Sequence, residues 1–212
     1  MNNLFVSVVL PVFNESENIN ELYKRLIAVL SIELCQDFEL IFVDDGSSDD
    51  SWHMIKTLAK KDNKIKAIRF SRNFGHHIAL TAGLDISSGE AVLTMDSDLQ
   101  DYPEEIPKLI NKYKEGYDVV FAIRKIRKFN FFKNLSSKLF TRIINSLAAT
   151  EIPINTTIFR IMSRQVVESF LSFQERERFF TGLISYIGFS QVGVPIEHGN
   201  RHKGKTKYSF NK

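Results

Sequence analysis

The chain has 212 residues, of which 43% are hydrophobic and 25% are charged, with ten glycines and five prolines. This composition is that of an ordinary globular protein, and it excludes a disordered chain, a collagen-like repeat and a small disulfide-stapled fold. A single cysteine, Cys35, excludes an internal disulfide and fits a reducing compartment. We expect one domain over residues 1–212, with no signal peptide at its start. We also expect no membrane span, since no apolar run reaches about 18 residues.

The formal net charge of +3 hides an uneven distribution. Two stretches hold basic residues and no acidic ones: 119–150 with seven, and 198–212 with five. The remainder carries 16 basic and 25 acidic residues, so it is acidic. Basic blocks of this kind suit an anionic partner such as phosphate, a membrane surface or nucleic acid. A merely solvated basic face explains them equally well.

The first 125 residues alternate between β-rich runs and segments with helical spacing. The predicted strands are Phe5–Val12, Phe38–Val43, Ile65–Phe70, Ala91–Met95 and Asp118–Ala122. The predicted helices are one that starts at Ser16 with Ile19, Leu22, Leu26 and Val29 on its apolar side, and then Ser51–Lys61, His77–Ile86 and Pro103–Glu115. Such alternation predicts βαβ units and an α/β fold: a Rossmann-like, mostly parallel sheet flanked by helices. The nearly continuous apolar strands agree, because a sheet covered on both faces has no solvent side.

After residue 125 the pattern changes. Apolar residues recur at helical spacing from Phe132 to Leu147, with lysine and arginine on the flanks, so the segment of about 124–150 predicts a basic amphipathic helix that faces a membrane or an acceptor. A core helix with a polar outer face is the alternative. A strand or turn near Ile158–Met162, helices over Gln165–Phe173 and Glu177–Ile187, and a strand at Gln191–Val194 complete the prediction.

Three of the predicted strands run into polar or acidic turns. Ligands of open α/β sheets bind outside the carboxyl ends of the strands, so these turns are candidates for a common site. A single acidic turn often only caps the next helix, but three at one edge are harder to explain that way. The turns are Pro11-Val12-Phe13-Asn14-Glu15, Asp44-Asp45-Gly46-Ser47-Ser48 and Asp96-Ser97-Asp98-Leu99-Gln100-Asp101.

Among these residues, Asp96 and Asp98 are the strongest candidates for metal ligands. On an extended segment, side chains two residues apart point to the same face, so both carboxylates can reach one cation. Hard oxygen ligands suit Mg²⁺ or Mn²⁺, with water and phosphate oxygens in the remaining positions. A helix-capping acidic turn is the alternative. Zinc-type His/Cys spacing, a Walker A sequence and a GxGxxG sequence are all absent from the chain. The adjacent pair His76 and His77 fits the start of a helix better than a ligand site.

Together, PVFNE, VDDGSSDDS, SRNFGHHIALTAGLD and MDSDLQDYPEE resemble the family 2 glycosyltransferases, which have the GT-A fold. Within that family the chain is most similar to the polyprenyl-phosphate glycosyltransferases, such as dolichyl-phosphate mannose synthase, bactoprenol glucosyltransferases and the aminoarabinose-transferring enzymes. The resemblance runs from about Val6 to Tyr208 and includes FRIMSR and NRHKGKTKYS.

The resemblance implies roles for residues that match these motifs. Pro11, Phe13, Asn14 and Glu15 would line the nucleotide pocket, Asp44 would hold the base or ribose, Asp45 would support that loop, and Arg72 and Gly75 would lie along the nucleotide. Asp96 and Asp98, the DXD motif, would bind the metal, with Gln100 beside the sugar or metal. Arg124 and Arg127 would meet phosphate on the acceptor side, and Arg160 would lie in the segment that faces the acceptor. Arg201, Lys205 and Lys207 would belong to a basic C-terminal loop, 198–212, that closes over the diphosphate.

The chain departs from the resembled pattern in two places. Many relatives have an acidic residue, a candidate catalytic base, where this chain has Ile158. Either Asp98 or Asp101 supplies the base, or none is needed, because a lipid phosphate is already an anionic nucleophile. Relatives also continue into C-terminal transmembrane helices, whereas this sequence stops at Lys212, which leaves the segment 128–147 as the expected membrane contact.

The expected function is inverting transfer of a sugar from a nucleotide diphosphate sugar, a UDP-sugar, to a polyprenyl phosphate. The reaction would use Mg²⁺ or Mn²⁺ at the cytoplasmic face of the membrane, in cell-envelope glycan synthesis. Nucleic acid is not an expected partner, since aromatic stacking platforms are absent. The sequence leaves open whether the chain forms a homo-oligomer. The alternatives are a family 2 transferase with a saccharide hydroxyl acceptor and a catalytically silent subunit that binds a sugar nucleotide.

Overall fold

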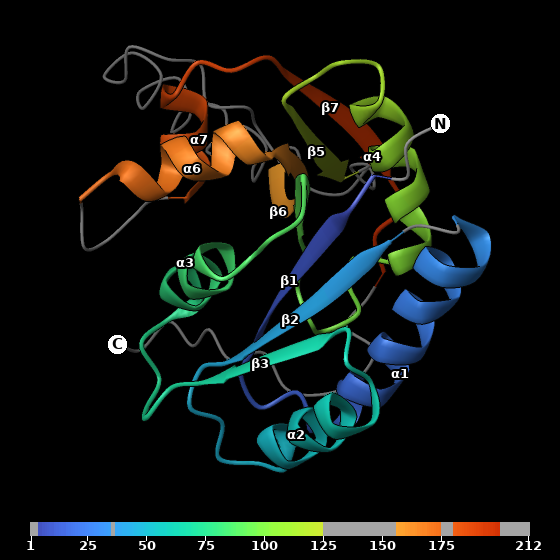
Figure 1. Ribbon diagram of the computed structural model, residues 1–212, viewed down its shortest axis with the longest axis vertical. Coiled ribbons are helices and arrows are strands. Elements are labelled where there is room, and N and C mark those ends of the chain that lie inside the picture. The colour runs from blue at the N-terminus through green and yellow to red at the C-terminus, as the bar shows by residue number, and fades with distance from the viewer. Residues whose placement is uncertain (1–3, 35–36, 125–155, 175–179, 200–212) are drawn as a thin grey trace, which may run out of the picture.

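The computed structural model describes residues 4–34, 37–124, 156–174 and 180–199 (Figure 1). The strands are β1 (Val6–Val12), β2 (Phe38–Asp44), β3 (Ile65–Arg69), β4 (Ala91–Thr94), β5 (Val119–Arg124), β6 (Thr156–Ser163) and β7 (Gln191–Ile196). The helices are α1 (Ser16–Ile27), α2 (Ser51–Lys61), α3 (His76–Asp85), α4 (Ile106–Tyr113), α6 (Arg164–Ser172) and α7 (Phe180–Tyr186). A π-helical turn (Ala28–Glu33) extends α1, and a 3₁₀ turn (Pro103–Glu105) precedes α4.

The described strands form one sheet in the order β3-β2-β1-β4-β6-β5-β7. Only β6 runs antiparallel to its neighbours β4 and β5; the remaining pairings are parallel. The carboxyl ends of β1, β2, β4, β5 and β7 therefore lie along the same edge. The sheet confirms the predicted α/β class.

Helices cover both faces of the sheet, as Figure 1 shows, with α1, α2 and α4 on one face and α3, α6 and α7 on the other. Every residue of β1 and of β2 is buried. Alternate residues feed the two cores: Val8 and Leu10 of β1 pack under α1, while Val9 packs under α3. Burial on both faces explains why these strands are apolar almost throughout.

The predicted elements in the described ranges are confirmed, with shifts of a few residues at their ends. Helix α2 has the predicted bounds, and α3 begins at His76, so the two adjacent histidines do lie at a helix start. The predicted helix Pro103–Glu115 is a 3₁₀ turn followed by α4. The basic amphipathic segment predicted over 124–150 lies outside the described residues after Arg124. Within the described ranges, every helix is too short or too polar to cross a bilayer.

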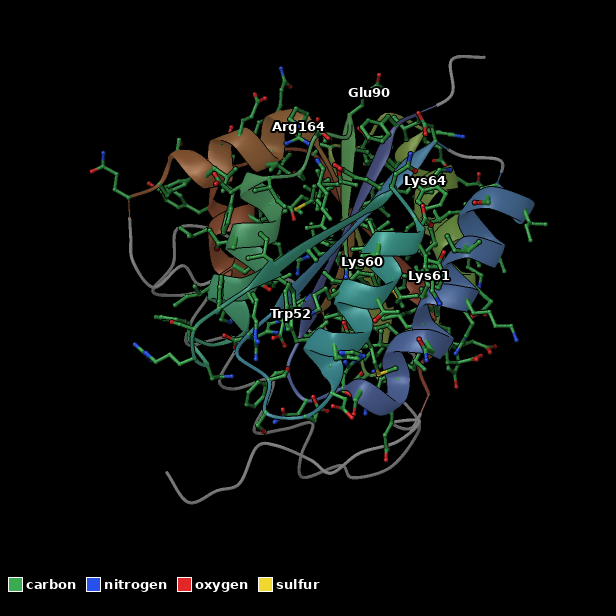
Figure 2. The ribbon with its side chains drawn as sticks, turned by 60° about the horizontal axis from the view of Figure 1, so that its bottom comes forward. Trp52, Lys60, Lys61, Lys64, Glu90 and Arg164 are labelled. Atoms are coloured by element: carbon green, nitrogen blue, oxygen red, sulfur yellow. The ribbon has the colours of Figure 1, made fainter. Side chains whose placement is uncertain are left out.

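A polar network fixes the amino ends of the central strands, opposite the site edge. Glu39 accepts a hydrogen bond from Ser7 Oγ at 2.6 Å and one from the Ser88 amide at 2.7 Å. The guanidinium of Arg164 donates to the Gly89 carbonyl, and the Arg164 amide donates to the Glu90 carbonyl at 3.0 Å. Figure 2 shows Arg164 and Glu90 next to one another at this end. The network ties β1 and β2 to the α3–β4 connection and to α6, and it keeps the strands in register.

Candidate active site at the carboxyl edge of the sheet

The three polar turns singled out in the sequence lie side by side at one edge of the sheet. Val12, the last residue of β1, pairs with Asp44, the last residue of β2, and the Asp45 amide donates to the Val12 carbonyl at 2.8 Å. On the other side of β1, Ser97 Oγ donates to the Pro11 carbonyl at 2.8 Å, so the turn after β4 is fastened to the end of β1. The predicted convergence is confirmed.

Asp45 holds the SRNFG segment in place. Its carboxylate accepts hydrogen bonds from the Phe74 amide at 2.7 Å, the Gly75 amide at 3.0 Å and Asn73 Nδ2 at 2.9 Å. Asp45 is 3% exposed, so these donors replace its water. Gly75, directly before α3, has φ +104, a backbone conformation that residues other than glycine rarely adopt. One buried carboxylate thus shapes the entry into α3.

The turn after β1 interlocks with the turn after β2. Asn14 has φ 54, and its Oδ1 accepts a hydrogen bond from the Ser48 amide at 2.8 Å. The Asn14 amide donates in turn to Ser47 Oγ at 2.9 Å. Glu15 is buried and accepts from Asn18 Nδ2 at 2.6 Å. The polar side chains of both turns therefore shape the backbone of the edge.

Asp44 is fully buried rather than presented to solvent. Its carboxylate accepts from the Ser47 amide at 3.2 Å and forms an ion pair with Arg69 Nε at 3.4 Å. Arg72 is exposed and stacks on the ring of Phe74, with 4.1 Å between the guanidinium carbon and the ring centroid. Of the residues expected along the nucleotide, Pro11 is buried and Phe13 is partly exposed at the same edge.

Asp96 and Asp98 are both partly exposed and alternate with buried Ser97 and Leu99. The expectation of an extended segment is wrong at this point: β4 ends at Thr94, and Asp98 lies in a turn. Two features bend the chain. Asp98 Oδ1 accepts from the Gln100 amide at 3.0 Å, and Leu99 adopts φ 61. The alternation of exposure that brings both carboxylates to the accessible side is retained.

Three carboxylates concentrate in this turn, Asp96–Asp101, which we call the metal loop after the cation that the sequence predicts there. Burial, together with Asp96 and Asp98, raises the pKa of Asp101 to about 6, against the opposing effect of Arg124 and His198. His76 Nε2 lies 3.8 Å from Asp96 Oδ1 at the start of α3, and burial lowers the pKa of His76 against the pull of Asp45 and Asp98. Proximity to a divalent cation would relieve this crowding of carboxylates.

The donor chemistry of the metal loop fits Mg²⁺ or Mn²⁺. Asp96 and Asp98 offer hard oxygen ligands with partial solvent access, which suits an ion that keeps water and phosphate oxygens in its shell. Among the described residues, no group of three or more His, Cys, Asp or Glu is placed to enclose a metal. Two carboxylates leave the other positions of such a cation to water or to oxygens of a bound molecule.

The remaining predicted residues lie in different surroundings. Arg124 is exposed at the end of β5, on the site edge. Arg160 is 2% exposed within β6; its Nη2 donates to the Thr157 carbonyl at 2.8 Å and to Thr181 Oγ1 at 3.1 Å, and its guanidinium lies over the Phe180 ring. Burial lowers the pKa of Arg160 to about 10. Arg127, Arg201, Lys205 and Lys207 lie outside the described residues.

Sequence reasoning missed two residues that shape this site. His198 follows β7 and lies against the metal loop, with Nε2 3.8 Å from Asp101 Oδ1. Its signal in the sequence is its place, two residues after a strand that ends at the site edge. Ser97 joins β1 to the metal loop, and its signal is the small polar residue between the two aspartates.

Residues 7–171 match the family model described as glycosyl transferase family 2. The chain belongs to this family. It is 42% identical over 207 residues to an uncharacterized glycosyltransferase, YkcC, of Bacillus subtilis (strain 168), covering 97% of this chain and 64% of the relative. It is 37% identical over 206 residues to the undecaprenyl-phosphate 4-deoxy-4-formamido-L-arabinose transferase of Enterobacter sp. (strain 638), covering 97% and 63%. The chain thus spans a little under two thirds of the length of these curated relatives.

A solved structure with a similar fold is the glucosyl-3-phosphoglycerate synthase of Mycobacterium tuberculosis, in complex with Mn²⁺, uridine diphosphate and phosphoglyceric acid. The TM-score is 0.64 at 21% sequence identity, and the match covers 93% of this chain and 72% of that one. The likeness confirms the fold expected for a family 2 glycosyltransferase.

Proposed function

We propose that this family 2 glycosyltransferase moves a sugar from a nucleotide diphosphate sugar, a UDP-sugar, to a polyprenyl phosphate, with inversion at the anomeric carbon. We further propose that residues 1–212 act as one GT-A domain at the cytoplasmic face of a membrane. The observation that carries the proposal is the metal loop: two partly exposed carboxylates at the carboxyl edge of the sheet, where α/β folds bind nucleotides. The name of the Enterobacter relative supports the acceptor class.

Asp96 and Asp98 would hold Mg²⁺ or Mn²⁺, which when bound neutralises charge that develops on the leaving diphosphate. The similar mycobacterial enzyme contains Mn²⁺ and uridine diphosphate, which supports this choice. Around the metal loop, Asp45 orders the SRNFG segment through its hydrogen bonds to Phe74 and Gly75. We propose that this segment and the turn after β1 line the nucleotide, with Arg72 on the exposed side.

The transfer itself needs little proton chemistry from the protein. The bond between the anomeric carbon and the diphosphate oxygen breaks, and its electron pair leaves with the diphosphate. An anionic oxygen of the lipid phosphate forms the new bond. Ile158 stands where a base is expected, and Asp101 has no exposed surface, so both favour a reaction without an obligate base.

Basic groups are still needed to bring two anionic reactants together. Arg124 ends β5 at the site edge, and we propose that it meets the acceptor phosphate with Arg127. Arg160, which is buried in β6, would lie in the segment that faces the acceptor without touching the phosphate. Arg201, Lys205 and Lys207 would contact the diphosphate. The chain leaves β5 and β7 at this edge, so Arg124, the first basic residue of one acid-free stretch, and His198, the first residue of the other, both lie on the side of the metal loop.

A transfer assay tests the proposal. The protein is incubated with a panel of nucleotide sugars, Mn²⁺ or Mg²⁺, and either undecaprenyl phosphate or a soluble saccharide, and products are identified by mass spectrometry. We expect a glycosylated lipid phosphate, and we expect Asp98→Asn to abolish most turnover while Asp50→Asn, an exposed change on the neighbouring turn, does not. A glycosylated saccharide as the only product would show that the acceptor is a saccharide and not a lipid phosphate. Nucleotide binding without any product would indicate a catalytically silent binding subunit.

Membrane contact is tested separately by flotation with vesicles. The two basic stretches predict stronger binding to vesicles with anionic lipid, because each basic residue near such a surface contributes about 1 kcal/mol. Equal binding to neutral and anionic vesicles would contradict a basic membrane face.

A further inference from the structure

Asp101 and His198 face one another where the metal loop meets the segment that follows β7. Asp101 is fully buried, and His198 Nε2 lies 3.8 Å from Asp101 Oδ1. The two residues also form an antiparallel backbone bridge, and the Gly199 amide donates to the Gln100 carbonyl at 2.9 Å. The contact therefore has a backbone part and a side-chain part.

The orientation of the His198 ring is fixed by its other nitrogen. His198 Nδ1 lies 2.8 Å from the Gly199 carbonyl, and a carbonyl oxygen only accepts hydrogen bonds, so Nδ1 carries a proton. Nε2 is therefore the nitrogen that faces Asp101, 3.8 Å from Oδ1, which is within ion-pair distance but longer than a hydrogen bond.

The surroundings of Asp101 make this partner important. Neither carboxylate oxygen of Asp101 makes a hydrogen bond within the described part of the chain, and both are buried. Asp96 and Asp98 oppose the ionisation of Asp101, while Arg124 and His198 support it. A buried carboxyl without a partner is costly, so the imidazole stabilises this end of the loop.

Packing holds the same segment against the loop. A Cβ built on Gly199 would lie 2.2 Å from the hydroxyl oxygen of Tyr102, so the Gly199 backbone rests directly on that ring. The guanidinium of Arg25 also lies over the Tyr102 ring, 5.2 Å from its centroid. The metal loop is thus fastened at Ser97 to β1 and at Asp101 to the segment after β7.

We propose that His198 is a positioning residue that acts through Asp101 to hold Asp98 and Gln100 in their binding arrangement. The inference rests on the proposed function, because it assigns the metal loop to a cation and a nucleotide. Removal of the imidazole would loosen the loop at Asp101 while the Ser97 fastening remains. The expected consequence is weaker binding of metal and nucleotide, with the fold retained.

Titration calorimetry with Mn²⁺ and UDP tests this role. We expect His198→Ala to weaken Mn²⁺-dependent UDP binding about tenfold, and His198→Gln, whose amide can donate to Asp101, to stay within about threefold of wild type. With nucleotide sugar as substrate, His198→Ala should raise KM and the Mn²⁺ concentration for half-maximal rate, and leave kcat at saturation within about twofold. His53→Ala, an exposed histidine on α2, and Asp85→Asn, an exposed aspartate at the end of α3, are the matched controls.

The outcomes separate the inference from the proposed function. If wild-type protein fails to bind UDP in the presence of Mn²⁺, the proposed function is wrong. If wild type binds and His198→Ala binds within twofold of it, or lowers kcat alone, the positioning role is wrong. A second measurement needs no metal: ¹⁵N correlation spectra of the histidine rings, with the His198 signals assigned by their loss in His198→Gln. We expect a protonated Nδ1, and a neutral ring protonated only at Nε2 would overturn the inference.

Discussion

Replacement of Asp45 by asparagine probes the carboxylate that orders the SRNFG segment. Oδ2 of Asp45 accepts from Asn73 Nδ2 and the Gly75 amide, and Oδ1 accepts from the Phe74 amide. An asparagine keeps one acceptor oxygen and turns an NH₂ group toward the other donors, so one or two hydrogen bonds to a charged group are lost. At about 1.5–3 kcal/mol for each such bond, we expect a loss of about 1.5–6 kcal/mol in the free energy of unfolding.

Urea denaturation of wild type and Asp45→Asn measures this loss, and UDP titration measures its effect on the site. We expect the variant to remain folded at 25 °C and to bind UDP more weakly, because the entry into α3 loses its support. Asp50→Asn is the matched control, since Asp50 is exposed in the same turn and makes no side-chain capping bond. A change below about 0.5 kcal/mol in Asp45→Asn would refute the claim that this carboxylate organises the segment.

Three further predictions concern the same edge. Gly46 has φ +70, and a Cβ there would lie 2.4 Å from the Arg72 carbonyl carbon. In urea denaturation, Gly46→Ala should therefore lower the free energy of unfolding by more than about 2 kcal/mol, whereas Gly116→Ala, with φ +103 and open space around it, should lower it by about 1 kcal/mol. Equal losses would contradict the close approach of the two turns. The pKa of Asp101 is raised to about 6 in the folded state from about 3.9 in the unfolded chain. Because the folded protein then binds more protons between these pH values, the contribution of Asp101 to stability should fall as pH rises from about 4 to about 6. Without metal, the stability of wild type relative to Asp101→Asn should decline over that window, and a constant difference would be inconsistent with the raised pKa. Ser97→Ala removes the hydrogen bond to the Pro11 carbonyl and should lower stability by about 1 kcal/mol, while an unchanged melting temperature would show that this link is not needed.

The strand order could be anticipated only in part from the sequence. Apolar runs such as VSVVLPV and FELIFV predict strands buried on both faces, and their alternation with helices predicts parallel pairing. The antiparallel strand β6 between β4 and β5 could not be predicted, because its pairing depends on contacts far apart in the chain. The broad outline therefore follows from local pattern, and the insertion of β6 does not.

The candidate site, like the strand order, could be predicted from the sequence only in part. The convergence of the turns after β1, β2 and β4 follows from parallel pairing and was predictable. The bend at Leu99 was not, because a positive φ in a leucine has no local sequence signal and depends on the hydrogen bonds around it. The contact between Asp101 and His198 joins residues nearly a hundred positions apart, so only the assembled sheet brings it into view.

The most direct test of the central claim is UDP binding to wild type and to Asp98→Asn, each measured by calorimetry with Mn²⁺ and with excess chelator. The account predicts that Mn²⁺ tightens UDP binding to wild type by at least tenfold and leaves UDP binding to Asp98→Asn unchanged. An equal gain from Mn²⁺ in both proteins would contradict it, because the cation would then bind away from the loop after β4.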